Sequence, residues 1–118
     1  MDIKIDEQIV EDVFITALEG GIGYWCQAEH YSPSKVEATI KVLNEDNGEP
    51  EGRSRKLSGA TVRRGFARLM QGPIEFLDET DRKRLIGEAF GKPENLDVDA
   101  GDADVIVQAG LFGEIKYA

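Results

Sequence analysis

Apolar residues recur at helical spacing at the start of the chain. They occupy every third or fourth position between residues 5 and 18, which predicts an amphipathic helix over residues 7–19. Asp6 precedes this helix as an N-cap, with apolar residues on either side placed as a hydrophobic staple. Gly20 and Gly21 follow the helix and are predicted to form its left-handed C-cap.

The pattern then changes to the period of a strand. Residues 23–31 are rich in aromatic side chains, and as a strand they would place Tyr24 on one face and Trp25 on the other. Residues 35–43 alternate apolar and polar side chains, which is typical of a half-buried antiparallel strand. After a polar loop, a weaker strand over residues 52–57 would complete a meander.

Three more helices are predicted in the second half of the chain. The first covers residues 59–71, with Ser58 as its N-cap and a stripe of apolar side chains along one face. The next begins at Asp78 or Thr80, and the last covers about residues 100–110 with Asp97 or Asp99 as its cap.

Residues 114–117 are short enough to form a final strand. The helix that begins near residue 80 is expected to direct Leu85, Ile86, Ala89 and Phe90 inward. The predicted fold is α+β: an antiparallel meander sheet of three to four strands packed with about four helices, in the order αβββαααβ. Since no linker or repeat interrupts the pattern, residues 1–118 are expected to form a single domain.

Charge is unevenly distributed along this acidic chain of 118 residues and net charge −9. Residues 1–51 carry 12 acidic and 3 basic side chains, residues 52–74 carry 6 basic and no acidic ones, and residues 75–118 carry 11 acidic and 5 basic ones. An acidic protein is a poor binder of duplex DNA, because phosphate binding needs a basic surface. Two hypotheses stay open: the central basic block binds a small anionic ligand, or the acidic surface binds a basic partner.

A cluster of glycine and aromatic residues over residues 20–25 is the most site-like segment. Its glycines follow a predicted helix and precede a strand, whereas a dinucleotide-binding loop has the opposite order, so a structural role is favoured. Tyr24 and Trp25 cannot both enter the core of a sheet that is covered on one face only. One of them is therefore expected to be exposed, where it could stack with Tyr31 on a planar ligand.

The basic block supplies candidate anion-binding residues. Arg64 and Arg68 lie one turn apart on a predicted helix and could hold a phosphate or carboxylate together. The alternative is that these arginines only balance the acidic ends through surface ion pairs. The full set of candidate ligand-binding residues is Tyr24, Trp25, Tyr31, Arg53, Arg55, Arg63, Arg64 and Arg68.

No group of side chains predicts catalysis, a metal site or a cofactor. Cys26 and His30 would lie about 13 Å apart along a strand, too far to act as a nucleophile and its base. The four aspartates of residues 97–104 lack the spacing of a calcium loop and are explained by helix capping. We therefore expect a protein that is not an enzyme, with no catalytic residues, no metal and no cofactor.

The cellular setting is expected to be cytoplasmic. The single cysteine cannot form an internal disulfide, no apolar run approaches the roughly 20 residues needed to cross a bilayer, and the start of the chain lacks the features of a signal peptide. We expect no contact with a membrane.

Two motifs carry a resemblance to a known family. The segments ALEGGIGYW, over residues 17–25, and DADVIVQAGLFGEIKY, over residues 102–117, resemble small acidic proteins of tailed bacterial and archaeal viruses and their prophages, a family without a characterised activity. The resemblance implies a viral accessory protein in the cytoplasm of an infected host cell. It carries over no functional residue.

Two functional hypotheses follow for a non-enzymatic binding protein, such as one that counters host defence. In the first, it sequesters a small phosphorylated or nucleotide ligand of the host, with the arginines beside an exposed aromatic residue. In the second, it is an acidic decoy that blocks the nucleic-acid-binding surface of a host protein, and its arginines are structural. A virion structural part or a small enzyme is a further alternative, and an exposed aromatic residue would suit a homodimer.

Overall fold

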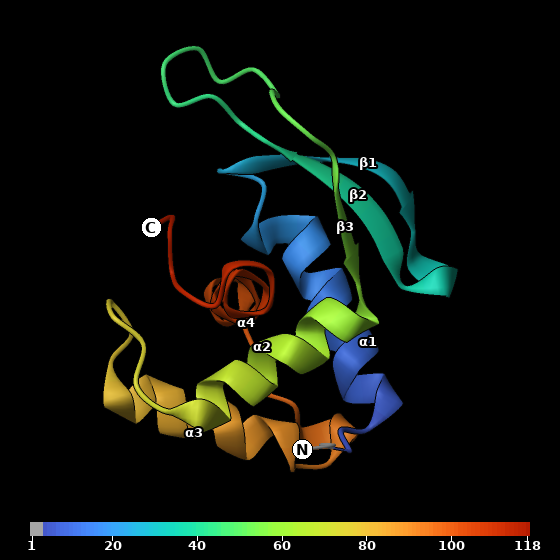
Figure 1. The fold of residues 1–118 in the computed structure, drawn as a ribbon. Coiled ribbons are helices and arrows are strands. Elements are labelled where there is room, and N and C mark those ends of the chain that lie inside the picture. Colours follow the sequence, from blue (N-terminus) through green and yellow to red (C-terminus); the bar gives the residue numbers. More distant parts are fainter. Residues whose placement is uncertain (1–3) are drawn as a thin grey trace.

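The computed structural model describes residues 4–118 as a three-stranded antiparallel sheet packed against four α-helices (Figure 1). The predicted α+β class and the meander are confirmed, and the order of elements is αβββααα. The predicted last strand is wrong, because residues 115–118 follow the final helix without regular structure. The elements are α1 (Glu7–Thr16), β1 (Cys26–Ser32), β2 (Glu37–Val42), β3 (Arg55–Ser58), α2 (Gly59–Gln71), α3 (Glu79–Ala89) and α4 (Ala100–Phe112).

The sheet covers one side of the helical layer (Figure 1). Its strands follow the order β1-β2-β3, and Ala38 of β2 pairs with Leu57 of β3. Ala38, Ile40 and Leu57 are buried, as the alternation along β2 predicts for the face turned to the helices. The pairing of β1 with β2 shifts register after Glu29, where His30 has a φ of 50°.

Below the sheet, α2 crosses α4 at close range, and α3 lies on the far side of α2 (Figure 1). The apolar stripe predicted for α2 is confirmed, since Val62, Phe66 and Leu69 are fully buried. Ser58 caps α2 in a reciprocal capping box with Thr61. The buried apolar residues of sheet and helices form one core.

The end of α1 differs from the prediction. The α-helix stops at Thr16 and continues as a π-helical turn over Ala17–Gly21. Gly20 and Gly21 do not have positive φ angles, so the predicted left-handed C-cap is wrong. Gly21 instead permits close packing, because a Cβ atom there would lie 2.6 Å from the carbonyl oxygen of Ala100, at the start of α4.

One apolar residue lies outside the core against expectation. Phe90, predicted to point inward, is 63% exposed because it follows the last turn of α3 rather than continuing the buried stripe of Leu85 and Ala89. The inward prediction is confirmed for Leu85 and Ala89, which are buried, and for Ile86, which packs against the core and is partly buried.

An acidic arm, defined as residues 44–51, joins β2 to β3 and extends beyond the sheet (Figure 1). It carries four acidic side chains and no basic one. The Asn44 side chain shapes its turn by accepting the backbone N–H groups of Asp46 and Asn47 and by donating to Glu51. The arm therefore has internal order although most of its side chains are exposed.

Candidate functional site

Tyr24 and Trp25 lie in a turn just before β1, not within a strand. The prediction that one is buried and one exposed is confirmed, with Trp25 3% and Tyr24 52% exposed. The prediction that they point to opposite faces is wrong, because both side chains reach the same carboxylate, that of Asp104. A turn does not impose the strict alternation of a strand, and so the two side chains converge.

Asp104 is the centre of this site. It lies on α4, is only 7% exposed, and accepts the Tyr24 hydroxyl at 2.5 Å and the Trp25 indole N–H at 2.8 Å. Gln108, one turn further along α4, donates to Asp104 at 2.9 Å. Three donors thus satisfy a buried charge that would otherwise be costly. Burial, and then the hydrogen bond to Asp104, raise the pKa of Tyr24.

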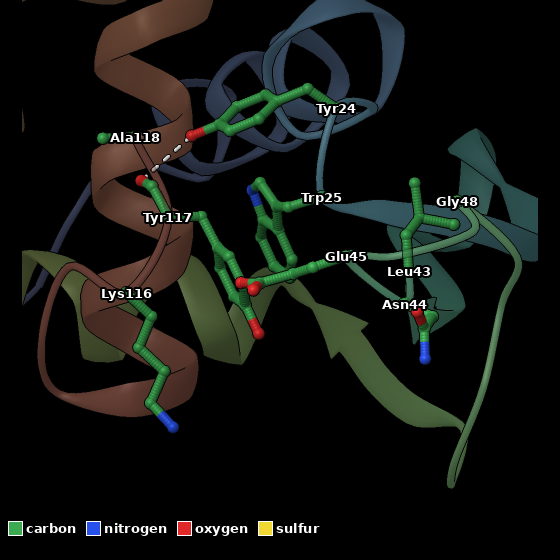
Figure 2. A pocket seen from close by; sticks show the side chains of 9 residues that line it. All are labelled: Tyr24, Trp25, Leu43, Asn44, Glu45, Gly48, Lys116, Tyr117 and Ala118. Carbon is green, nitrogen blue, oxygen red and sulfur yellow. Dashed lines mark hydrogen bonds between the residues drawn. The ribbon is translucent and has the colours of Figure 1, made fainter.

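Gln108 also holds the end of the described chain, the segment 114–118, which we call the tail. Its side-chain oxygen accepts the backbone N–H groups of Lys116 at 2.8 Å and Tyr117 at 2.9 Å, and its amide donates to the Tyr117 carbonyl at 2.9 Å. The Tyr24 hydroxyl lies 3.0 Å from the same carbonyl, the contact dashed in Figure 2. The Tyr117 ring stacks on Trp25 with centroids 4.9 Å apart and planes within 6°.

A cavity of about 330 Å³ opens between this aromatic pair and the acidic arm. In Figure 2, Tyr24 and Tyr117 lie next to α4, and the Glu45 side chain extends from the acidic arm toward them. Lys116 borders it too, but its ammonium group lies 4.9 Å from the Phe112 ring centre. The remaining lining residues are Trp25, Leu43, Asn44, Gly48 and Ala118.

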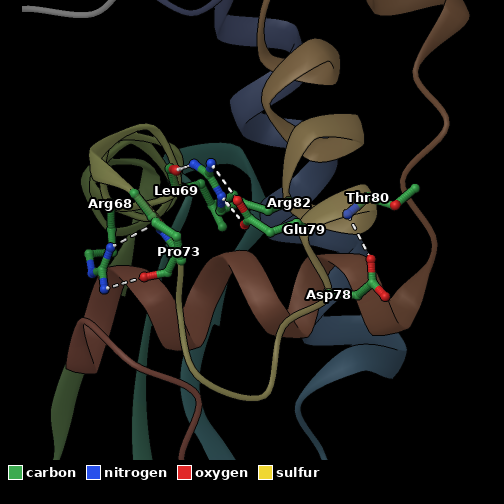
Figure 3. A network of polar contacts seen from close by, with 8 residues as sticks. Arg68, Leu69, Pro73, Asp78, Glu79, Thr80 and Arg82 are labelled. Atoms are coloured by element: carbon green, nitrogen blue, oxygen red, sulfur yellow. Dashed lines mark hydrogen bonds and ion pairs between the residues drawn. The ribbon is translucent and has the colours of Figure 1, made fainter.

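The central arginines are engaged elsewhere. Arg68 donates to the carbonyl of Gly113 at 2.9 Å and to those of Gly72 and Pro73, and so ties the end of α4 to the loop after α2. Figure 3 shows Arg68 beside Pro73. It also shows Arg82, which donates hydrogen bonds to the Leu69 carbonyl and to Glu79. Arg68 thus donates hydrogen bonds to carbonyl groups at helix ends, which is a structural role. The charge pattern of the sequence alone cannot distinguish this role from anion binding.

The other basic candidates are dispersed. Arg63 pairs with Glu7, and Arg64 donates to Thr61 and to the Gly110 carbonyl at 3.5 Å. Arg55 lies over the Phe112 ring at 5.4 Å. Arg53 is exposed between the acidic arm and β3.

Tyr31 does not join Tyr24 and Trp25. Its ring packs on Phe14 at 5.9 Å, and its hydroxyl is buried without a hydrogen-bond partner among the described residues. Burial raises the pKa of this hydroxyl. Tyr31 is therefore placed at the edge of the core, apart from the cavity.

Cys26 is buried at the first position of β1, and its thiol donates to the Ile22 carbonyl at 3.4 Å. Burial, and then the charge of Asp104, raise the pKa of the thiol to about 12. A thiol with a raised pKa stays protonated at neutral pH, which removes the nucleophilic thiolate.

We expect Cys26 to react with iodoacetamide at pH 8 at least about a hundredfold more slowly in the folded protein than in urea, because both access and ionisation are restricted. Mass spectrometry of timed samples measures the rate. Equal rates in the two states would contradict a buried, protonated thiol.

Comparison with profiles of known protein families, with curated proteins and with solved structures gives no match. Within residues 4–118 no three His, Cys, Asp or Glu side chains are grouped so as to hold a metal ion. No helix of this part of the chain is long and apolar enough to span a membrane.

Sequence reasoning missed the residues that build the site, Asp104, Gln108 and Tyr117. Asp104 was assigned to helix capping, although Asp99 and Asp102 alone form the capping box of α4. A signal was present, since Asp104 and Gln108 are four residues apart in an otherwise apolar stretch and so share one helix face. Buried polar residues at such spacing indicate a shared partner.

Proposed function

We propose that this chain is a non-enzymatic accessory protein of a virus, which binds a basic surface of a host protein in place of nucleic acid. The observation that carries the proposal is the cavity between the aromatic pair and the acidic arm. Its lining combines two tyrosines with Glu45, and aromatic rings beside a carboxylate are the chemistry that recognises an arginine or lysine side chain.

The charge distribution around the cavity supports a cationic partner. The acidic arm presents Glu45, Asp46 and Glu49 as exposed carboxylates, and the arm contains no base that would neutralise them. Arg63, Arg64 and Arg68 do not border the cavity, because they bind Glu7 or polar groups of α2, α4 and the adjoining loops. Structural arginines with a free acidic surface are the arrangement expected of a decoy.

The decisive measurement uses a fluorescent nona-arginine peptide bound to a short DNA duplex. The wild-type protein is expected to displace the duplex from the peptide, and its direct binding to the labelled peptide, measured without duplex, should weaken as salt rises. The double variant Glu45→Gln, Glu49→Gln is expected to lose about tenfold or more in displacement, because two exposed carboxylates of the arm are removed.

The matched control is Glu75→Gln, Glu94→Gln, which changes net charge equally at exposed positions flanking α3. It is expected to displace the duplex as the wild type does. Equal losses in the two double variants would show that only overall charge matters and would reject the acidic arm as the binding surface.

A second candidate function is sequestration of a nucleotide or similar phosphorylated ligand in the same cavity. The observation that favours it is that two cations, Arg55 and Lys116, flank Phe112, whose ring centre lies 6.0 Å from that of Tyr117. A planar base on the tyrosines with a phosphate near these cations would match a nucleotide.

This candidate is tested by thermal unfolding with a panel of mono-, di- and cyclic nucleotides. A ligand at a hundred times its dissociation constant adds about 2.7 kcal/mol to the free energy of unfolding, a clear rise in the melting temperature. Arg55→Ala should remove the rise and the neighbouring Arg53→Ala should retain it. No shift with any nucleotide would eliminate the second candidate.

A further inference from the structure

The tail, residues 114–118, is bound to the body as a peptide ligand is bound to a receptor. Among the described residues, each hydrogen bond of the tail goes to the side chain of Gln108 or Tyr24. None is made to a strand or to the backbone of a helix. Two backbone N–H groups, one carbonyl and one aromatic ring are recognised, which are features that any extended segment with a correctly placed tyrosine offers.

The receptor side, which we call the cradle, consists of Tyr24, Trp25 and Gln108. Asp104 orients all three, since it accepts a hydrogen bond from each of them. Gln108 is fully buried and Trp25 is 3% exposed. The cradle is thus fixed by bonds that do not involve the tail, and it stays formed when the tail leaves.

An empty cradle is unfavourable. Without the tail, the side-chain oxygen of Gln108 loses both of its donors, and one face of the Trp25 ring loses the stacked Tyr117. Unpaired polar groups and an exposed indole favour occupation by a replacement of the same chemistry.

We infer that the cradle takes the tail of a second copy of this chain, so that two copies exchange residues 114–118 and form a dimer. A second copy carries the same tail, and the structure shows that this tail fits the cradle. The exchanged tail therefore makes the same contacts as the tail does in its own chain. Only the hinge differs between the two states.

Gly113 is that hinge. It ends α4 with a φ of 71°, and its N–H bonds to the Ala109 carbonyl. The five tail residues can span roughly 17 Å when extended, enough to reach a neighbouring body if the ends of two α4 helices meet. The attached tail has an effective concentration of about millimolar, so exchange is expected as the protein itself approaches that concentration.

The first test examines the cradle with a defined probe, the hexapeptide Gly-Glu-Ile-Lys-Tyr-Ala, which copies residues 113–118. The Tyr117→Ala variant of the 118-residue chain leaves the cradle unstacked, and Trp25 is the only tryptophan, so its fluorescence reports occupancy. We expect a saturable fluorescence change with this peptide and none with the peptide that has alanine in place of tyrosine. No change, in a variant whose circular dichroism matches the wild type, would overturn the inference.

The second test asks whether the donor is another copy. Native mass spectrometry and light scattering of the wild type should show a dimer fraction that rises with concentration and is lost in Tyr117→Ala. Gly113→Ala strains the left-handed hinge and should lower the concentration of half-dimerisation about fivefold or more. A peptide that binds while the wild type stays monomeric up to millimolar concentration would overturn tail exchange.

Discussion

Replacing Gly65 by alanine is expected to lower the free energy of unfolding by about 3 kcal/mol, a large part of the stability of a small domain. Gly65 lies on α2 where this helix crosses α4. A Cβ atom there would lie 2.0 Å from the carbonyl oxygen of Ile106, well inside the contact distance of two atoms. The backbones of α2 and α4 must separate to make room, and the core between them loses its packing.

The crossing has a second glycine that makes the expectation specific. A Cβ atom at Gly110 of α4 would lie 2.0 Å from the carbonyl oxygen of Thr61 on α2, so Gly110→Ala should destabilise to a similar degree. Urea unfolding followed by circular dichroism measures both variants.

Gly87→Ala is the control for the helix crossing. Gly87 is an exposed residue of α3, and its added Cβ would meet no atom within 4 Å beyond its chain neighbours and its own helix backbone. This substitution is expected to stabilise the protein by about 0.5–1 kcal/mol through helix propensity. A loss of less than about 1 kcal/mol in Gly65→Ala would mean that the two helices are not held at the distance described.

The periodic parts of the fold could be predicted from the sequence. The stripe of Val62, Phe66 and Leu69 and the alternation of Ala38 and Ile40 report burial directly, because each lies in a regular element with a single buried face. The sequence predicts the cap Ser58, and it narrows the other two caps to Asp78 or Thr80 and to Asp97 or Asp99, because a cap bonds to residues close to it in sequence. The structure has Ser58, Asp78 and Asp99 as the caps.

The site could be predicted only in part, because its contacts join distant parts of the chain. Trp25 and Asp104 are 79 residues apart, and no local pattern pairs them. The short length of residues 114–117 suits a final strand, but a strand needs a neighbouring backbone, and Gln108 offers a side chain instead. Arg68 likewise found its partner in the end of α4, far along the chain.

Replacing Asp104 by alanine is expected to be the most destabilising change within the site, with a loss of about 3–5 kcal/mol in the free energy of unfolding. The Trp25 indole N–H and the Gln108 amide are buried, and both donate to one oxygen of Asp104. Without that carboxylate the indole N–H has no acceptor among the described residues, and Gln108 keeps its contacts with the tail but loses the bond that orients it.

Two further variants distinguish the effect of losing the buried carboxylate from the effect of losing any acidic side chain. Asp104→Asn preserves shape and one acceptor oxygen, so it should lose roughly half as much stability as the alanine variant. Asp97→Ala removes an exposed acid just before α4 and should change stability by no more than about 0.5 kcal/mol. Urea unfolding gives the three values, and the emission of Trp25 in the folded state reports whether Tyr117 is still stacked.

If Asp104→Ala were as stable as Asp97→Ala, Asp104 would not hold Tyr24, Trp25 and Gln108 together. The cradle would then have to be fixed by core packing alone.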